Sequence, residues 1–209
     1  MSTWKRTAIL RGGDFETREE EGKRTITGYF AVFGGEYWLW DTAYETIDPG
    51  AFDLGADTDV RALANHDTTL VLGRTTVGTL TLRVDEHGLG GTILINDRDQ
   101  DAVNLYERVK RGDVSQCSFG FDILTESREK RDDGIVVYHL QRVKLYEVSI
   151  CTFPAYESTG VEARQASEAE IERRQAEEVA RAVEEAQREA AERLEAWKAE
   201  MIARIRGLI

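Results

Sequence analysis

The chain has 209 residues, of which 41% are hydrophobic, and it carries a formal net charge of −12. A chain of this length and composition can bury a substantial core, and no uncharged apolar run is long enough to predict a membrane span. The strong acidity argues against nonspecific binding to nucleic acid.

Composition changes sharply near residue 160. The preceding part is rich in Gly, Thr, Val and aromatic residues with turn signals at short intervals, which predicts a β-rich domain with few helices. After it, Glu, Arg and Ala dominate, which predicts a long helix. We therefore expect an α+β, mainly β, domain over residues 1–160 and a charged amphipathic helix over residues 161–209.

Three histidines are the candidates for a general base. His66 ends the short apolar run 60–64 at a predicted strand-to-loop junction, which makes it the strongest of the three. His87 lies in a predicted turn between strands 79–84 and 89–95, where a solvated side chain is expected. His139 lies within the apolar run 135–140, and we interpret it as a strand-surface histidine.

A helix is expected over residues 101–110. Its apolar residues fall at helical spacing and Gly112 supplies a stop signal. We expect this helix to pack against the sheet.

The run 114–121 alternates in character, which predicts a strand whose two faces differ. Cys117 shares a face with two phenylalanines, and this face should belong to the core. Ser118 falls on the opposite face beside Gly120, where we expect its hydroxyl to be accessible to another chain. The same parity favours a buried, structural Cys117 over a nucleophilic one.

Glu147 lies in a second predicted strand, residues 143–151. Parity groups it with Val143, Leu145, Ser149 and Cys151. A carboxylate on a mostly apolar face is costly unless a partner pairs with it. That partner is either a histidine that becomes charged during catalysis or an arginine in a structural pair, and an exposed carboxylate on an edge strand remains an alternative.

The segment after residue 160 carries one apolar stripe with steps of three and four residues. Its members are Ala176, Val179, Val183, Ala186, Ala190, Leu194, Trp197, Met201, Ile205 and Leu208. The larger residues concentrate toward the end, which predicts a docking surface for a partner helix. A solvated linker helix and a coiled coil between copies are the alternatives.

The two cysteines, Cys117 and Cys151, form neither a disulfide framework nor a metal-ligand spacing, so we expect free thiols in a reducing cytoplasm. The first ten residues lack the apolar stretch of a secretion signal, and none is expected.

Several short motifs follow one another in a specific order over roughly the first three quarters of the chain. They are ITGYFAVF (26–33), IDPGAF (47–52), NHD (65–67), LGR (72–74), GL (88–89), RGDVS (111–115), CSFGF (117–121), EVSI (147–150) and PAY (154–156). In these motifs the chain resembles the prohead maturation proteases of tailed bacteriophages, serine peptidases similar in fold to the herpesvirus assembly proteases. The resemblance implies a compact β-barrel-like protease domain that needs no cofactor or metal.

Position by position, the resemblance makes Ser118 the nucleophile and His66 the general base, while Glu147 matches the acidic position that orients the base. Cys117 departs from the family pattern, which has a plain apolar residue there. The implied reaction is hydrolysis of a peptide bond through an acyl-enzyme. The motif also suggests oxyanion-stabilising amides near Gly73 and Arg74, although a solvated turn fits those residues equally well.

The resemblance further implies the substrates. These are the N-terminal scaffolding region of the major capsid protein, or a separate scaffold protein, together with the protease itself, inside the assembling prohead in the host cytoplasm. A homodimer would provide activation, and the last helix would be a targeting segment removed by self-cleavage. The rival functions are a capsid-associated scaffold that cuts nothing and an esterase, which the absence of a Gly-x-Ser-x-Gly elbow at Ser118 disfavours.

Overall fold

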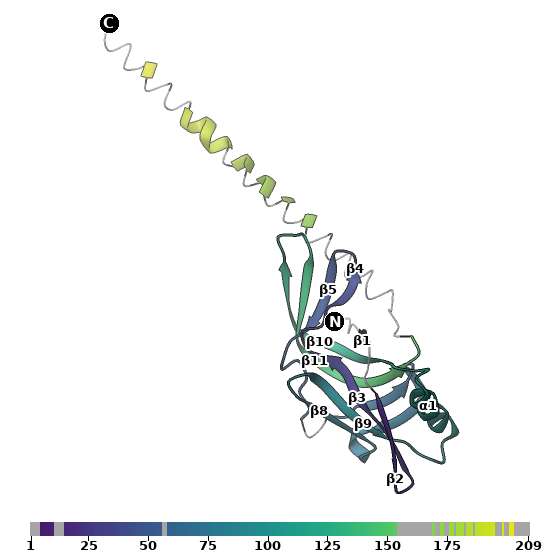
Figure 1. Cartoon of the computed structure of the whole chain (residues 1–209). Helices are drawn as coiled ribbons and strands as arrows, with labels where there is room; N and C mark the ends of the chain where they lie inside the picture. Colours follow the sequence, from purple (N-terminus) through teal and green to yellow (C-terminus); the bar gives the residue numbers. More distant parts are fainter. Residues whose placement is uncertain are drawn as a thin grey trace. The chain divides into compact units, whose positions relative to one another are not determined.

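A computed structural model describes residues 5–10, 15–55 and 58–153, together with helical residues between 169 and 202. The chain divides into two compact units, Met1–Val161 and Glu162–Ile209. In its described residues the first unit is mainly β with a single α-helix (Figure 1). The expectation of an α+β, mainly β, fold is confirmed.

The described strands have these bounds: β1 (Lys5–Leu10), β2 (Glu16–Glu20), β3 (Lys23–Val32), β4 (Tyr37–Trp40), β5 (Ala43–Ile47), β6 (Arg61–Ala64), β7 (Asp67–Arg74), β8 (Leu80–Val84), β9 (Gly88–Leu94), β10 (Gln116–Lys130) and β11 (Val136–Cys151). A 3₁₀ turn, η1 (Thr75–Val77), follows β7, and α1 (Gln100–Arg111) joins β9 to β10. The predicted hairpin of strands 79–84 and 89–95 is confirmed as β8 and β9.

The strands form two sheets. One has seven strands, in the order β1-β10-β11-β5-β4 with β6 paired to β11 and β7 paired to β6, and the other has the order β2-β3-β9-β8. Neither sheet closes on itself among the described strands, so the expectation of a β-barrel-like domain is wrong. The larger sheet forks because one edge of β11 pairs first with β5 and further along with β6.

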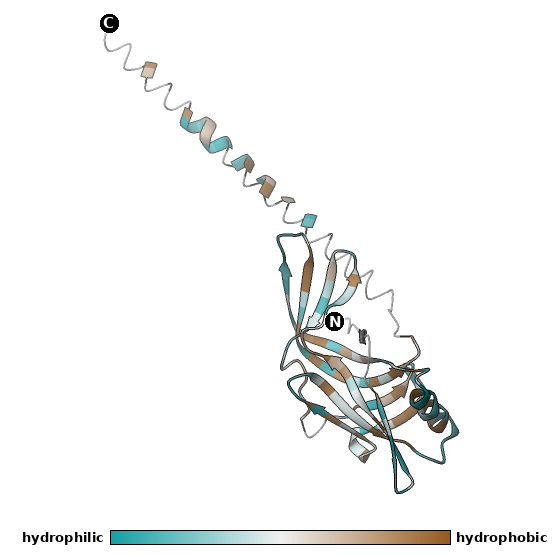
Figure 2. Ribbon diagram, viewed as in Figure 1, coloured by the Kyte–Doolittle hydropathy of each residue, from teal (hydrophilic) through white to brown (hydrophobic). Residues whose placement is uncertain are grey.

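The core lies where the two sheets and α1 meet, and it draws buried residues from all three. Figure 2 shows the apolar residues gathered on the central strands, while the β2–β3 hairpin is hydrophilic. Cys117, Phe119 and Phe121 of β10 have no exposed surface. Their predicted inward face is therefore confirmed.

Helix α1 is defined at both ends by its caps. The Asp99 side chain accepts hydrogen bonds from the first free amides of the helix, and Gly112 ends it in the left-handed region at φ 87°. The buried face consists of Ala102, Leu105, Tyr106 and Val109. The helix contacts β2, β3 and β7, so the expectation that it packs against a sheet is confirmed.

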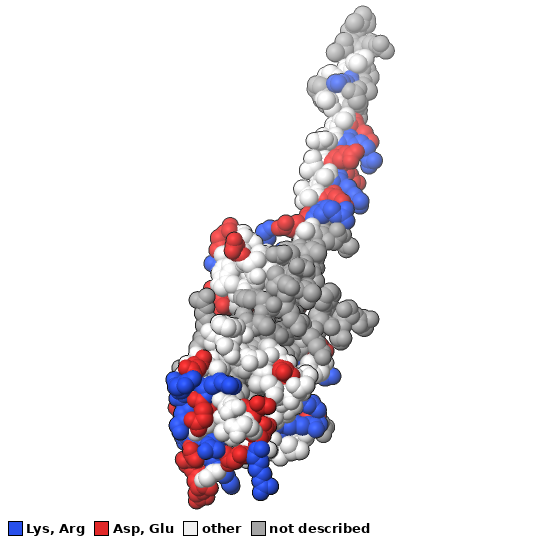
Figure 3. Space-filling model, turned by 90° about the vertical axis from the view of Figure 1, so that its right-hand side faces the viewer, with Lys and Arg blue, Asp and Glu red and all other residues white. Residues whose placement is uncertain are grey.

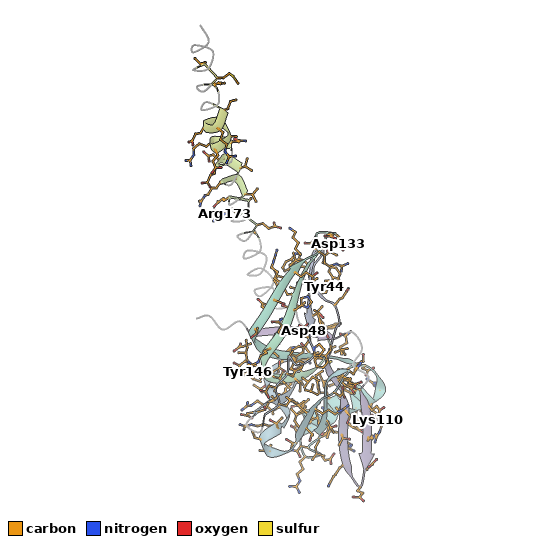
Figure 4. All side chains as sticks on the ribbon, turned by 90° about the vertical axis from the view of Figure 1, so that its left-hand side faces the viewer. Tyr44, Asp48, Lys110, Asp133, Tyr146 and Arg173 are labelled. Carbon is orange, nitrogen blue, oxygen red and sulfur yellow. The ribbon has the colours of Figure 1, made fainter. Side chains whose placement is uncertain are left out.

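The far halves of β10 and β11 run together with β4 and β5 as an arm (Figure 1). Figure 4 places Asp133 at the tip of this arm and Tyr146 nearer the centre of the unit. The arm has its own small core of Ala43, Val136 and Tyr138. Strand β11 therefore begins in the arm and continues into the part of the seven-stranded sheet that pairs with β6.

The described residues of the second unit are helical, which confirms the predicted helix there. Pairs four residues apart connect its charged side chains, for example Arg173 with Glu177 at 2.8 Å. Figure 3 shows both signs of charge along it. Its described apolar residues Val179, Val183, Leu194, Met201 and Ile202 are exposed. Trp197 and residues 203–209, which belong to the predicted docking surface, lie outside the described residues.

Within the described part of the chain, no helix combines the length and apolar character that crossing a membrane requires.

Candidate functional site

A two-residue turn connects β6 to β7 and carries His66. Asn65 and His66 have φ values of 52° and 60°, so both lie in the left-handed region, as a type I′ hairpin turn requires. Asparagine and histidine are among the non-glycine residues that tolerate this region best. The expectation that His66 lies at the end of a strand is confirmed.

Three hydrogen bonds hold this turn on the end of β11. The Asn65 amide donates to the Ile150 carbonyl at 3.0 Å, and the Asn65 Oδ1 accepts from the Thr152 amide at 2.8 Å. The His66 amide donates to Ser149 Oγ at 3.2 Å. Because β6 also pairs in parallel with β11 from Glu147 to Ile150, the position of His66 relative to β11 is fixed by the turn and by the strand that precedes it.

The imidazole of His66 contacts the carboxylate of Glu147, with 2.7 Å between Nδ1 and Oε1. The other oxygen of Glu147, Oε2, accepts a hydrogen bond from the Ser149 hydroxyl at 2.6 Å. Glu147 therefore has histidine and serine partners in the structure, and its burial is compensated by them.

Ser118 lies on the same face of the sheet as this pair. It is directly opposite Ser149 in the register of β10 and β11, and Gly120 is directly opposite Glu147. Residues directly opposite in an antiparallel pair share a face. A Cβ built on Gly120 would lie 2.5 Å from Glu147 Oε1, so the carboxylate extends over the glycine. The structure thus brings all three predicted site residues to one sheet face.

The predicted accessibility of Ser118 is wrong, because the residue has no exposed surface. In the plane of the sheet, β1 lies on one side of it, with Ile9 opposite Ser118, and β11 lies on the other. The alternation of a strand predicts the face on which a side chain lies. It does not predict what covers that face in the folded chain.

The pKa of His66 is raised by its surroundings. Burial of the imidazole by itself lowers this pKa, but hydrogen bonds to Cys151 and Glu147 and the negative charge of Glu147 outweigh burial and raise the pKa to about 10. The imidazole therefore holds its proton more tightly than a free histidine does.

The second nitrogen of His66 faces a cysteine. The Cys151 Sγ lies 3.8 Å from His66 Nε2, a contact that sequence reasoning missed. The available signal was parity, which places Cys151 on the face of Glu147. Cys117, the cysteine considered from the sequence, is buried against the Tyr29 carbonyl at 3.1 Å, and burial raises the pKa of its thiol.

The other two histidines lie elsewhere. His87 is in the β8–β9 turn, with its ring edge-on to that of Tyr29 at 4.5 Å between centroids. His139 is on the arm, where its Nδ1 lies 3.3 Å from Asp48 and its Nε2 lies 3.6 Å from Glu129. Both fit the structural interpretations expected from the sequence.

The donors of Arg74 are already engaged. The Arg74 amide donates to Thr79 Oγ1 at 2.9 Å, and its guanidinium makes two bonds to Asp59 at 2.7 and 2.8 Å. In this conformation the Arg74 amide is not available for an oxyanion. Within the described residues, no group of three or more His, Cys, Asp or Glu side chains is arranged to hold a metal ion.

The fold and the site define a mainly β protein that groups a serine, a histidine and a carboxylate on one sheet face, a set of side chains that serine hydrolases use. The chain belongs to the caudovirus prohead serine protease family, whose model matches residues 13–174. This match extends past the composition change near residue 160.

One curated relative is the prohead protease of Enterobacteria phage HK97, which is 30% identical over 148 residues. The match covers 68% of this chain, and the chain spans only 61% of that relative's length. Among solved structures, the bacteriophage T4 capsid assembly protease matches with a TM-score of 0.45 and 12% identity, over 72% of this chain and 99% of that one. This structural similarity is too low to bear on the site.

Proposed function

We propose that the chain is a serine endopeptidase of prohead maturation, with Ser118 as nucleophile, His66 as general base and Glu147 as the residue that orients the base. One observation carries the proposal: His66 Nδ1 lies 2.7 Å from Glu147 Oε1, on the sheet face that also bears Ser118. Membership of the prohead serine protease family supports the same assignment.

The chemistry follows from these roles. Neutral His66, the minor form at neutral pH given its raised pKa, takes the proton of Ser118 as the serine oxygen attacks the scissile carbonyl, and the imidazolium then returns that proton to the leaving amine. Glu147 fixes the tautomer, since its contact with Nδ1 leaves Nε2 as the nitrogen that exchanges protons. Water then hydrolyses the acyl-enzyme, with His66 again accepting a proton.

The burial of Ser118 means that the site must open before a peptide reaches the hydroxyl. We attribute this opening to self-association in the crowded prohead, which would prevent cleavage before assembly. A dilution series tests this idea. Specific activity should fall as the protein is diluted, and a constant specific activity contradicts activation by dimerisation.

The proposed substrates are the N-terminal scaffolding region of the major capsid protein or a separate scaffold protein, and the protease itself. Cleavage would take place inside the assembling prohead in the host cytoplasm. The relative from phage HK97 carries the name of prohead protease, which supports this substrate class.

We also propose that residues 1–160 are the protease domain and that residues 161–209 form a separate helix that binds scaffold or capsid protein. The exposed Val179, Val183 and Leu194 in its described part support a docking role, and a coiled coil between copies is the alternative. Deleting residues 161–209 should abolish incorporation into proheads. Unchanged incorporation would contradict the targeting role.

The deciding experiment is intact-mass spectrometry over time, with and without the capsid protein, beside Ser118→Ala. Defined fragments should appear with the parent chain and be absent with Ser118→Ala, and their masses give the cleavage sites, including any that release the terminal helix. Persistence of the fragments in Ser118→Ala would contradict the assignment of the nucleophile.

A capsid-associated scaffold that cuts nothing is the second candidate, and the complete burial of Ser118 favours it. A scaffold should support prohead maturation equally well with Ser118→Ala. A protease should not, so maturation in that variant separates the two functions.

A further inference from the structure

Ser149 makes two hydrogen bonds that join the backbone of one proposed site residue to the side chain of another. Its hydroxyl donates to Glu147 Oε2 at 2.6 Å and accepts from the His66 amide at 3.2 Å. A hydroxyl has one proton to donate and two lone pairs to accept, so both bonds form at the same time. Ser149 has no exposed surface, so bulk water does not compete for these bonds.

We propose that Ser149 is a positioning residue, which fixes the Glu147 carboxylate and the His66 turn relative to each other and thereby aims the imidazole toward Ser118. This inference rests on the proposed function, and no step of the mechanism above uses Ser149.

The carboxylate needs such a partner because its terminal torsion is soft. Rotation about the last bond of a glutamate side chain has broad, roughly two-fold preferences, so one contact does not define the carboxylate plane. In the structure His66 binds Oε1 and Ser149 binds Oε2, and each oxygen has a defined role. Loss of the Ser149 bond leaves only the imidazole to orient the carboxylate.

The turn needs the bond from the His66 amide to the Ser149 hydroxyl because His66 adopts an uncommon backbone conformation. Its φ of 60° lies in the left-handed region, which a residue with a side chain occupies only when its surroundings hold it there. The Ser149 hydroxyl satisfies the amide of this residue. Ser149 also lies directly opposite Ser118 across the two strands, so the same residue borders all three members of the site.

The first test measures the site without measuring activity. The chain has three histidines, so NMR titration of their ring protons gives three separable curves, with His87 and His139 as internal references. In a Ser118→Ala background that keeps the chain intact, Ser149→Ala should lower the pKa of His66 from about 10, because the contact with Glu147, which raises this pKa together with Cys151, is no longer held in place. An unchanged His66 titration would overturn the proposal.

Ser127→Ala is the matched control. Like Ser149, Ser127 is a serine of the β10–β11 pair whose hydroxyl accepts a hydrogen bond, here from Gln141 at 3.2 Å, and it lies opposite His139 in the register. It lies on the arm, so its removal should leave the His66 titration as in the parent chain.

The second test is kinetic and includes a graded variant. Ser149→Ala should lower kcat roughly 100-fold with little change in KM, as expected for a misplaced catalytic group. Ser149→Cys has a side chain of similar size with a weaker donor, so its kcat should lie between those of the parent chain and Ser149→Ala. It replaces the alanine variant if that variant fails to fold. In a Glu147→Ala background the substitution Ser149→Ala should cost little more, because both changes disable the same unit.

The two proposals fail in different ways. Cleavage that persists in Ser118→Ala overturns the proposed function while the titration still decides the role of Ser149. A full, additive loss in the Glu147→Ala background would show that Ser149 acts only through general stability, and it would overturn the positioning role alone.

Discussion

Gly120 and Glu147 face each other across β10 and β11, and the carboxylate occupies the space that a side chain on the glycine would need. A Cβ there would lie 2.5 Å from Glu147 Oε1 and 3.1 Å from Glu147 Cγ. The glycine therefore leaves room for the carboxylate that contacts His66.

We expect Gly120→Ala to displace this carboxylate. The added methyl group meets the end of a flexible side chain, so the fold should survive while kcat falls roughly 100-fold through misplacement of the base. Peptide-cleavage kinetics measure the expected fall in kcat, and thermal unfolding measures whether the fold survives. Gly55→Ala is the control, because its Cβ would meet only Asp53 Oδ1 at 3.8 Å. Wild-type kcat in Gly120→Ala would contradict the assigned role of Glu147.

The His66–Glu147 pair predicts a pH-dependent stability. The pKa of His66 rises from 6.5 to about 10 on folding, so its contribution is fully present below pH 6.5 and is lost as the pH rises through about 10. Glu147→Gln should therefore lower the free energy of unfolding most near neutral and mildly acidic pH, and the deficit should shrink toward pH 10.

Urea denaturation at a series of pH values measures this difference, with Ser118→Ala as the parent so that the chain stays intact. Glu129→Gln is a suitable control, because this exposed carboxylate also lies beside a histidine, 3.6 Å from His139. If the loss in the free energy of unfolding caused by Glu147→Gln does not change with pH, the His66–Glu147 pair is not the source of that loss.

The contact between Cys151 and His66 raises the question of which residue attacks. We expect Cys151→Ala to retain cleavage, while Ser118→Ala loses on the order of 10⁴-fold or more in kcat. Because Cys151 is among the groups that raise the pKa of His66, its removal should lower that pKa and shift the acidic limb of the pH–rate profile to lower pH. The reverse pattern of losses would identify Cys151 as the nucleophile.

The turn that carries His66 should depend on Asn65 in two separable ways. Asn65→Gly keeps the left-handed conformation but loses the bond from the Thr152 amide, whereas Asn65→Ala loses the bond and also strains the backbone. The alanine variant should therefore be less stable than the glycine variant by about 1–2 kcal/mol. Equal stabilities in chemical denaturation would mean that backbone strain at this turn is negligible.

The sequence predicted those parts of the fold that depend on local patterns. The inward face of β10 followed from strand alternation, and α1 followed from helical spacing and the glycine at its end. The grouping of Glu147 with Ser149 and Cys151 on one face also came from alternation. Each of these predictions needs only a few neighbouring residues.

The features that could not be predicted depend on how distant segments pair. The fork of the larger sheet depends on β5 and β6 sharing one edge of β11, which no local pattern encodes. The burial of Ser118 depends on what surrounds β10 in the folded chain. The contact of Cys151 with the ring of His66 follows from the parallel pairing of β6 with β11, which joins segments more than 80 residues apart.

The separation in sequence between His66 and its partners has a consequence for when this site can exist. His66 bonds to Glu147 and Ser149 of β11, and its neighbour Asn65 bonds to Thr152 just after that strand, so these partners are synthesised more than 80 positions later. A growing chain folds from its N-terminus as it emerges from the ribosome, so the turn at Asn65 and His66 exists as sequence long before its anchor does. The site can therefore form only after β11 has been synthesised, and a chain arrested before β11 carries Ser118 and His66 without the carboxylate that contacts the imidazole.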